Sequence, residues 1–335
     1  MGEIFDVLDR AKMANGPIMG DYAVNLYPSE GSAKVGSSVY GKCLRAAFFR
    51  YKAAVQQEVH LDDNSISIPV QEKPNAKAQW IFEAGNRFES AIVDCARDAK
   101  ILLQGHVKIS IPVGGLAING EIDAVFSDKH GIPVGIEIKS IQGSLAETAI
   151  IGNQGMRARR LKGEPKVEHV IQTAIYAWHL KEQIPRFKIL YIMRDKCFRE
   201  EFQVVVKEDS EKRKLIYVDN ELWKYFTLDD VFDRYKKLAF HINSNTTPER
   251  DYTLIYDDNT MNHLFKTKQL PKGDSEKWDK YWEREQEYKL WEQADPQLRG
   301  KEPRQLKRPE RGDWNCAWCS AKNLCYNKDN TPRGS

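Results

Sequence analysis

The sequence predicts an α/β protein in which a mixed central β-sheet is flanked by helices. Apolar and polar residues alternate between Gly115 and Asp128, as in a strand, and a second apolar row follows the turn signal Asp128-Lys129-His130-Gly131. Apolar residues at helical spacing indicate helices on either side, over about Lys77–Lys100 and Lys166–Lys181. The length of 335 residues suits one large domain or about two ordinary ones, and a hydrophobic content of 41% is enough for a buried core.

The first helix places a carboxylate beside its apolar stripe. Glu89, within Gly85-Asn86-Arg87-Phe88-Glu89, lies at the edge of the stripe, from which its side chain can lean over the sheet. We expect Cys95 to fill space in the core, whereas Cys197, in a turn, is an ordinary loop thiol. The stripe consists of Ala84, Phe88, Ala91, Ile92, Cys95 and Ala99.

The two strands bring further charged residues together. Asp123 points away from the apolar row of its strand, and Glu137 and Lys139 share the polar face of the next one. If the hairpin is symmetric about His130, Asp123 faces Glu137 with Cβ atoms about 4.5 to 5.5 Å apart. Two ionised carboxylates repel at that separation unless a cation lies between them, which indicates a hard divalent metal such as Mg²⁺. Lys139 could hold or deprotonate an attacking water, or offset charge that develops on a phosphate.

The second helix adds a polar stripe opposite its apolar face. His169, Gln172, Tyr176 and His179 recur at helical spacing, while the other face carries apolar residues such as Ile171. A solvated helix face is one interpretation of this stripe, and a face that supports a site on the sheet is the other.

The order of these residues resembles the motifs of the PD-(D/E)XK nuclease superfamily, in its RecB-like branch: Glu89, Gly120-x-x-Asp123, Glu137-x-Lys139 and Gln172-x-x-x-Tyr176. The resemblance implies a restriction-endonuclease-like mixed sheet flanked by helices, with Gln172 and Tyr176 supporting the site and contacting the DNA backbone. The catalytic residues that it implies are Asp123, Glu137, Lys139 and Glu89. The ligands that it implies for Mg²⁺ or Mn²⁺ are Glu89, Asp123, Glu137 and Ile138.

Four of the six cysteines form a split set, with Cys43 near the start and Cys316-x2-Cys319-x5-Cys325 near the end. Four thiolates suit either a structural zinc or an iron-sulfur cluster, and spacing alone does not decide between them. The split resembles the iron-sulfur staple of RecB-like exonucleases, including CRISPR-associated and AddB-type members. That resemblance implies a [4Fe-4S] cluster that joins the N- and C-terminal regions, with structural Zn²⁺ as the alternative.

Charge is informative through its distribution, because a net charge of +3 is no footprint of nucleic-acid binding. Basic residues crowd two segments, either of which could bind phosphates or be solvated loops. The first, between Lys139 and the second helix, contains Arg157, Arg159, Arg160, Lys162 and Lys166. The second, before Cys316, contains Arg299, Lys301, Arg304, Lys307, Arg308 and Arg311. We expect Arg157, Arg159 and Arg160 to bind DNA together with Gln172 and Tyr176.

The chain divides by composition into successive regions. In the helical region, a helix over Ser275–Ala294 carries aromatic residues that either stack unpaired bases or, by the favoured interpretation, pack inside the protein. A loop is expected around Pro248–Gly273. The regions are 1–73 (N-terminal, helical, with Cys43), 74–207 (nuclease core), 208–298 (helical and aromatic-rich), 299–330 (C-terminal cysteines) and 331–335 (a remnant of an expression tag).

Taken together, the motifs predict a metal-dependent DNA nuclease. The resemblance to RecB-like nucleases implies an exonuclease that acts on single strands or DNA ends, in recombination, repair or phage DNA metabolism. The alternatives are a structure-specific endonuclease and a non-catalytic iron-sulfur subunit that binds DNA in a recombination or CRISPR-adaptation complex. No G-x-x-x-x-G-K-[ST] motif occurs, so unwinding would need a helicase or recombination partner. No signal peptide and no apolar run of about 20 residues is found, so we expect a soluble, cytoplasmic protein of a bacterial, archaeal or phage-infected cell that does not bind membranes.

Overall fold

The computed structural model of the protein describes residues 43–54, 59–61, 64–66, 76–152, 163–313, 316, 319 and 321–326. These residues fall into two compact units, which lie within Ser38–Glu249 and Arg250–Gly334. The described residues include no helix that is both long enough and apolar enough to cross a lipid bilayer.

The first unit is built around a β-sheet to which the described residues contribute seven strands, in the order β3-β4-β5-β6-β7-β8-β9. Neighbouring strands pair antiparallel except β5 and β6, which run parallel. The sheet is therefore mixed and mostly antiparallel, and the predicted α/β class is confirmed. The strands are β3 (Leu102–Val113), β4 (Leu116–Ser127), β5 (Pro133–Ile141), β6 (Arg186–Met193), β7 (Arg199–Glu208), β8 (Lys214–Val218) and β9 (Glu221–Leu222), and a separate two-stranded sheet joins β1 (Val59–Leu61) to β2 (Asn64–Ile66).

The hairpin between β4 and β5 has the predicted register. Ala124 pairs with Ile136, so the ladder is centred on His130, as the sequence indicates. The side chain of Asp128 holds the turn, because its Oδ1 atom accepts hydrogen bonds from the backbone N–H groups of His130 at 2.8 Å and Ile132 at 2.9 Å. This local closure sets which residues of β4 and β5 share a face.

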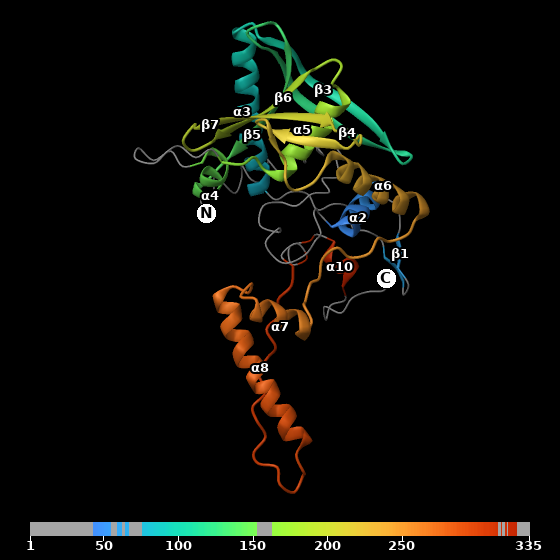
Figure 1. The fold of residues 1–335 in the computed structure, drawn as a ribbon, viewed down its shortest axis with the longest axis vertical. Coiled ribbons are helices and arrows are strands. Elements are labelled where there is room, and N and C mark those ends of the chain that lie inside the picture. The colour runs from blue at the N-terminus through green and yellow to red at the C-terminus, as the bar shows by residue number, and fades with distance from the viewer. Residues whose placement is uncertain are drawn as a thin grey trace. The chain divides into compact units, whose positions relative to one another are not determined.

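Helices pack on the sheet from opposite sides (Figure 1). On one face, Val93 and Ala96 of α3 (Ala76–Asp98) form a core cluster with alternate residues of β4 and β5, among them Ile136. The other face packs against α5 (Val167–His179), which contacts β6 and β7. Cys95 is exposed, so its prediction as a core residue is wrong: α3 turns Val93 and Ala96 toward the sheet instead. Cys197 lies exposed in the turn after β6, as expected.

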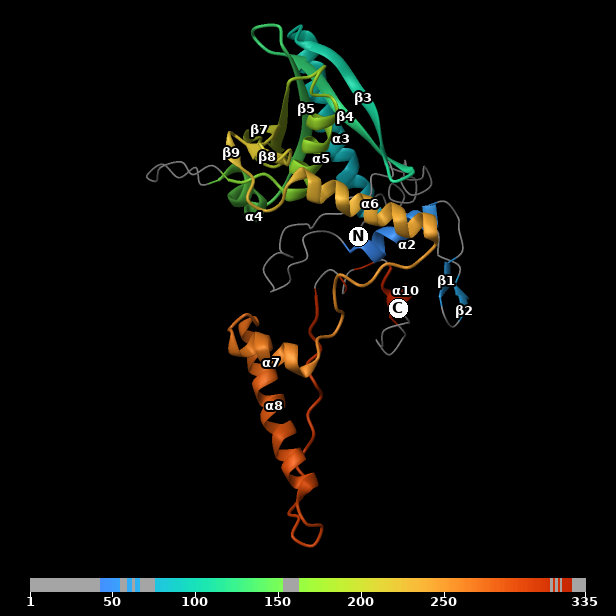
Figure 2. The same ribbon diagram turned by 45° about the vertical axis from the view of Figure 1, so that its right-hand side comes forward.

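Five of the described strands were not assigned from the sequence: β1 and β2, in the N-terminal region expected to be helical, and β3, β8 and β9 of the large sheet. The longest, β3, pairs along β4, and the two form the long hairpin of Figure 2. Its turn rests on α6 (Leu228–Ser244), since the Asn243 side chain donates to the Gly114 carbonyl at 2.8 Å. A Cβ atom at Gly114 would lie 2.9 Å from that of Ala239, and Gly114 has a φ of 58°, so glycine suits this turn. The expected helical region after Glu208 instead begins with β8 and β9.

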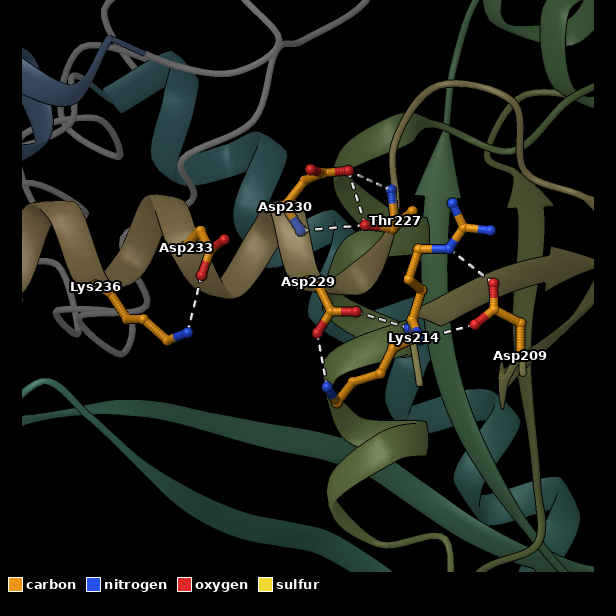
Figure 3. Close-up of polar contacts among 8 residues, drawn as sticks. Asp209, Lys214, Thr227, Asp229, Asp230, Asp233 and Lys236 are labelled. Carbon is orange, nitrogen blue, oxygen red and sulfur yellow. Dashed lines mark hydrogen bonds and ion pairs between the residues drawn. The ribbon is translucent and has the colours of Figure 1, made fainter. Parts of the chain in front are cut away.

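Polar contacts anchor the start of α6 to the sheet (Figure 3). Thr227 and Asp230 form a capping box, in which each side chain accepts a hydrogen bond from the backbone of the other residue. Lys214 of β8 donates to Asp229 from both its backbone nitrogen, at 2.7 Å, and its Nζ atom, at 2.6 Å. The first unit is completed by α2 (Leu44–Ala54), which contacts α6, and by α4 (Ser144–Ala146) and the π-helical turn η2 (Glu147–Ile151).

The second unit contains α7 (Asp258–Lys266), α8 (Lys272–Gln293) and α10 (Lys322–Cys325). The helix α7 lies where a loop was predicted, and Asp257 caps its start by accepting from Thr260 N at 2.7 Å. Trp278 of α8 is fully buried in a cluster with residues of α7, so this part of the aromatic stripe packs inside the unit. Arg308 and Arg311 form ion pairs with Asp258 and Asp274 respectively, which places two of the predicted phosphate-binding side chains in structural roles.

Candidate active site

The candidate site lies where the hydrogen-bonded pairing of β4 and β5 ends, at Ala124 and Ile136. Asp123 is the next residue of β4 beyond this pair. The Asp123 Oδ2 atom accepts a hydrogen bond from the backbone N–H of Ile138 at 2.6 Å. The Asp123 carboxylate thereby replaces the backbone carbonyl that would accept from this N–H group if the strand pairing continued. This bond holds Asp123 beside the residue that precedes Ile138, which is Glu137.

Glu137 and Lys139 lie on the same face of β5, as predicted. The Lys139 Nζ atom donates to Glu137 Oε1 in an ion pair. Glu137 is 2% exposed, and its second oxygen, Oε2, is buried without a hydrogen-bond partner among the described residues. A buried carboxylate oxygen without a partner is costly, and such atoms need an explanation.

The pKa values in the site show that Lys139 only partly offsets the effects of burial and mutual repulsion on the carboxylates of Glu137 and Asp123. The pKa of Glu137 is raised to about 8, mainly by burial and also by the neighbouring Asp123, against the opposing effect of Lys139. Burial also raises the pKa of the Asp123 carboxyl. The pKa of Lys139 is raised because the carboxylates of Glu137 and Asp123 outweigh the lowering effect of burial. An added cation near these oxygens would favour their ionised forms.

Glu89 faces this group from α3. Burial raises the pKa of the Glu89 carboxyl, and the charge of Asp123 raises it next. The Nδ1 atom of His106, on β3, lies 4.0 Å from Glu89 Oε1 and 2.8 Å from Glu121 Oε1. Sequence reasoning missed His106, because the strand that carries it was not assigned and its φ of 51° departs from strand geometry.

Tyr176 approaches from α5 and is 3% exposed, which excludes a solvated position for this member of the polar stripe. The Gln172 Nε2 atom donates to the Tyr176 hydroxyl at 3.0 Å. A Cβ atom at Gly120 would lie 2.5 Å from that hydroxyl oxygen, so only glycine leaves room for the ring. Burial, and then the charge of Glu137, raise the pKa of Tyr176 to about 12. His179, at the end of the stripe, is exposed.

A second polar pair lies on the same face of the sheet. Tyr191 of β6 is paired with Lys139 of β5 in the parallel register, so their side chains are neighbours. The Tyr191 hydroxyl lies 2.7 Å from His169 Nδ1 and accepts from Lys166 N at 3.0 Å. Helical spacing predicts His169 as part of the polar stripe, but no role for Tyr191 follows from the sequence, because nothing in the sequence of β6 indicates which helix covers it.

The carboxylates of Asp123, Glu137 and Glu89 are the candidate metal ligands of the site. Among residues in the ranges that the structure describes, no group of three or more His, Cys, Asp or Glu side chains is arranged to hold a metal ion. The unsatisfied Glu137 Oε2 atom and the mutually raised carboxyl pKa values nevertheless fit a cation between Asp123 and Glu137, with Glu89 nearby. The carboxylates are hard oxygen donors, the chemistry that Mg²⁺ and Mn²⁺ prefer.

The other predicted sites are described only in part. Cys43 directly precedes α2 in the first unit, whereas Cys316 and Cys325 are buried in the second unit and Cys319 is half-buried. The charges of Cys316 and Cys325 contribute to the raised pKa of Tyr326, after its burial, so both thiols lie near that ring. The basic residues Arg157, Arg159 and Arg160 lie outside the described residues.

Comparisons with known proteins identify no relative by sequence: no family model and no curated protein matches the chain. One solved structure, described as "Crystal structure of SSO0001", matches 72% of this chain and 87% of its own length, with 15% sequence identity and a TM-score of 0.32. A similarity at this level carries no argument about the fold or the function of this chain.

Proposed function

We propose that this chain is a metal-dependent DNA nuclease, most readily an exonuclease that acts on single strands or DNA ends with Mg²⁺ or Mn²⁺. The observation that carries the proposal is Glu137. Its carboxylate is buried next to Asp123 and ion-paired with Lys139, and one of its oxygens has no hydrogen-bond partner in the part of the chain that the structure describes. A purely structural role would leave this arrangement as an uncompensated cost, whereas a bound divalent metal would satisfy it.

Each residue has a definite part in this proposal. Glu89, Asp123, Glu137 and the main chain of Ile138 would hold the metal, and a bound metal would supply Lewis-acid activation of a water and of the scissile phosphate. Lys139 is cationic, and its Nζ atom is suited to offset the charge that builds on that phosphate. Gln172 and Tyr176 hold the wall of the site through their hydrogen bond, since the buried hydroxyl of Tyr176 supports the sheet at Gly120.

The four-cysteine cluster stays a proposal, which is based on the split of the cysteines between the two ends of the sequence and on the family resemblance of that split. We propose that Cys43, Cys316, Cys319 and Cys325 bind a [4Fe-4S] cluster, with structural Zn²⁺ as the alternative. The paired burial of Cys316 and Cys325 near Tyr326 supports a role for those two thiols together.

The test is a degradation time course with end-labelled linear single strands, linear duplex and circular single strands, in Mg²⁺, in Mn²⁺ and in EDTA. We expect metal-dependent loss of the linear strands, abolished by Asp123→Ala and by Lys139→Ala, with thermal melts showing that both variants stay folded. Undiminished cleavage by either variant contradicts the proposal. Cutting of circular or branched DNA would indicate the endonuclease alternative, and binding without cleavage would indicate the non-catalytic subunit.

A further inference from the structure

An exposed aromatic residue, Phe82, lies on the same face of α3 as Glu89. The two residues are separated by two helical turns, which places Phe82 about 10.5 Å before Glu89 along the helix axis. Phe82 is 59% exposed, and the two residues before it, Trp80 and Ile81, are 43% and 44% exposed. These three side chains form an apolar surface patch near the candidate site, and such patches commonly mark binding sites.

This part of α3 lies at the carboxyl ends of β5 and β6, the two parallel strands of the sheet. A Cβ atom at Gly85, one turn after Phe82, would lie 3.4 Å from the hydroxyl oxygen of Ser140 in β5. Arg194 directly follows β6, and its backbone N–H donates to the carbonyl of Ile141, at the end of β5, at 2.9 Å. The carboxyl ends of parallel strands are where open α/β sheets usually bind their ligands.

Arg194 also supplies a positive charge beside the apolar patch. Its Nη1 atom donates to the backbone carbonyl of Ile81 at 3.3 Å, so the guanidinium is held next to the residue that precedes Phe82. The guanidinium of arginine is always ionised in proteins. Proteins that bind unpaired nucleic acid combine these two features, because an aromatic ring stacks on a base while a cation attracts the phosphate backbone. The patch is therefore suited to a nucleic-acid strand, and its shared helix face with Glu89 makes it continuous with the candidate site.

We propose that the ring of Phe82 stacks on an unpaired base of the DNA strand that is cleaved, while Arg194 attracts the backbone of the same strand. The short distance between Phe82 and Glu89 assigns this base to a nucleotide close to the cleaved linkage. A base inside a duplex is stacked on its neighbours and must be extruded before it offers a face to a protein ring. The contact therefore selects a strand that is single or has opened at its end. This inference rests on the proposed function and deepens it by naming the form of DNA that is bound.

The experiment measures affinity for labelled single strands in an Asp123→Ala background, which keeps the strand intact. Each strand carries one abasic site, which moves by one nucleotide from one strand to the next. We expect a position at which loss of the base weakens binding by about 5- to 150-fold, the range for stacking of one base on an aromatic side chain. Phe82→Ala should weaken binding to the intact strand by a similar factor and remove the effect at that position. The base analogue 2-aminopurine at this position should lose fluorescence on binding to the protein with Phe82, but not to the Ala variant.

Further substitutions separate stacking from other apolar contacts. Phe82→Trp keeps an aromatic face and should retain binding, whereas Phe82→Leu keeps apolar bulk without that face and should behave like Phe82→Ala. The affinity for single strands relative to duplex should fall in the Ala and Leu variants. Phe240→Ala is the matched control, because it removes another ring of the first unit, on α6, that is 65% exposed. Arg194→Gln should weaken binding equally at every abasic position and make the slope of log affinity against log salt shallower by up to about 0.7.

The outcomes that overturn this inference differ from those that overturn the proposed function. A wild-type protein that neither binds nor degrades DNA would overturn the proposed function and the inference with it. A wild-type protein that degrades DNA, combined with Phe82→Ala binding that matches the parent at every abasic position, overturns the inference alone. Full affinity in Phe82→Leu would show that stacking is not the contact. A lower melting temperature of Phe82→Ala with unchanged affinity would show that the ring packs against the protein itself, which likewise overturns the inference.

Discussion

Gly120 packs against the Tyr176 ring, and this packing predicts the effect of adding one methyl group. A Cβ atom at Gly120 would lie 2.5 Å from the Tyr176 hydroxyl oxygen and 2.8 Å from its Cε1 atom. The ring cannot move away freely, because Tyr176 is 3% exposed and its hydroxyl is bonded to Gln172. Gly120→Ala should therefore lower the free energy of unfolding by about 1–3 kcal/mol, the usual cost of overpacking a core.

The second half of this prediction is a double-mutant cycle. In a Tyr176→Leu background the ring edge that meets the new methyl group is absent. Gly120 is not among the glycines with positive φ, so alanine fits its backbone. The same Gly120→Ala change should then be neutral or stabilise by about 0.4–1 kcal/mol, through the reduced entropy of the unfolded chain.

Urea unfolding of the four proteins, followed by circular dichroism, measures the coupling. Gly105→Ala is the matched control, because a Cβ atom there meets nothing within 4 Å. The reasoning is refuted if Gly120→Ala costs the same in both backgrounds, or no more than Gly105→Ala. Cleavage should fall with stability in the single variant, since the displaced Tyr176 ring borders Glu137 and Asp123.

Three further predictions concern the carboxylate, the cysteines and the basic segment. Because the pKa of Glu137 is raised from 4.5 to about 8, mainly by burial, the folded protein retains a proton that the unfolded chain loses between these pH values. Without metal, the free energy of unfolding should therefore fall as the pH rises from 4.5 toward 8. Thermal melts across this pH range measure the dependence, and Glu137→Gln should flatten it. Protein purified without oxygen should be brown and contain iron. The Cys43→Ser substitution should remove the colour and lower the melting temperature, whereas Cys95→Ser should do neither. Colourless protein with stoichiometric zinc would exclude the iron-sulfur cluster. Alanine should be substituted for Arg157, Arg159 and Arg160 together, and DNA affinity measured by titration at several salt concentrations. The slope of log affinity against log salt should become shallower by up to about 0.7 for each phosphate contact that is lost. An unchanged slope would indicate that the segment is a solvated loop.

The sequence by itself determined the features that depend on neighbours along the chain. Alternation placed Asp123, Glu137 and Lys139 on the correct faces of their strands, because side chains in a strand point to opposite sides in turn. The turn at Asp128 closes a hairpin of a few residues, so its register about His130 follows from local geometry. Helical spacing likewise located the long helices to within a few residues.

Tertiary structure alone decided which elements meet. Whether Tyr176 is a solvated stripe residue or a buried support depends on how α5 lies over β4, where Gly120 receives its ring. The hydrogen bond between His169 and Tyr191 joins a helix to a strand whose pairing with β5 spans a long connection. The rotation of α3 about its own axis exposed Cys95 and buried Val93, although both lie near the same apolar stripe. A periodic pattern records which residues of one element share a face, but the partner of that face is set by packing between segments distant in the chain.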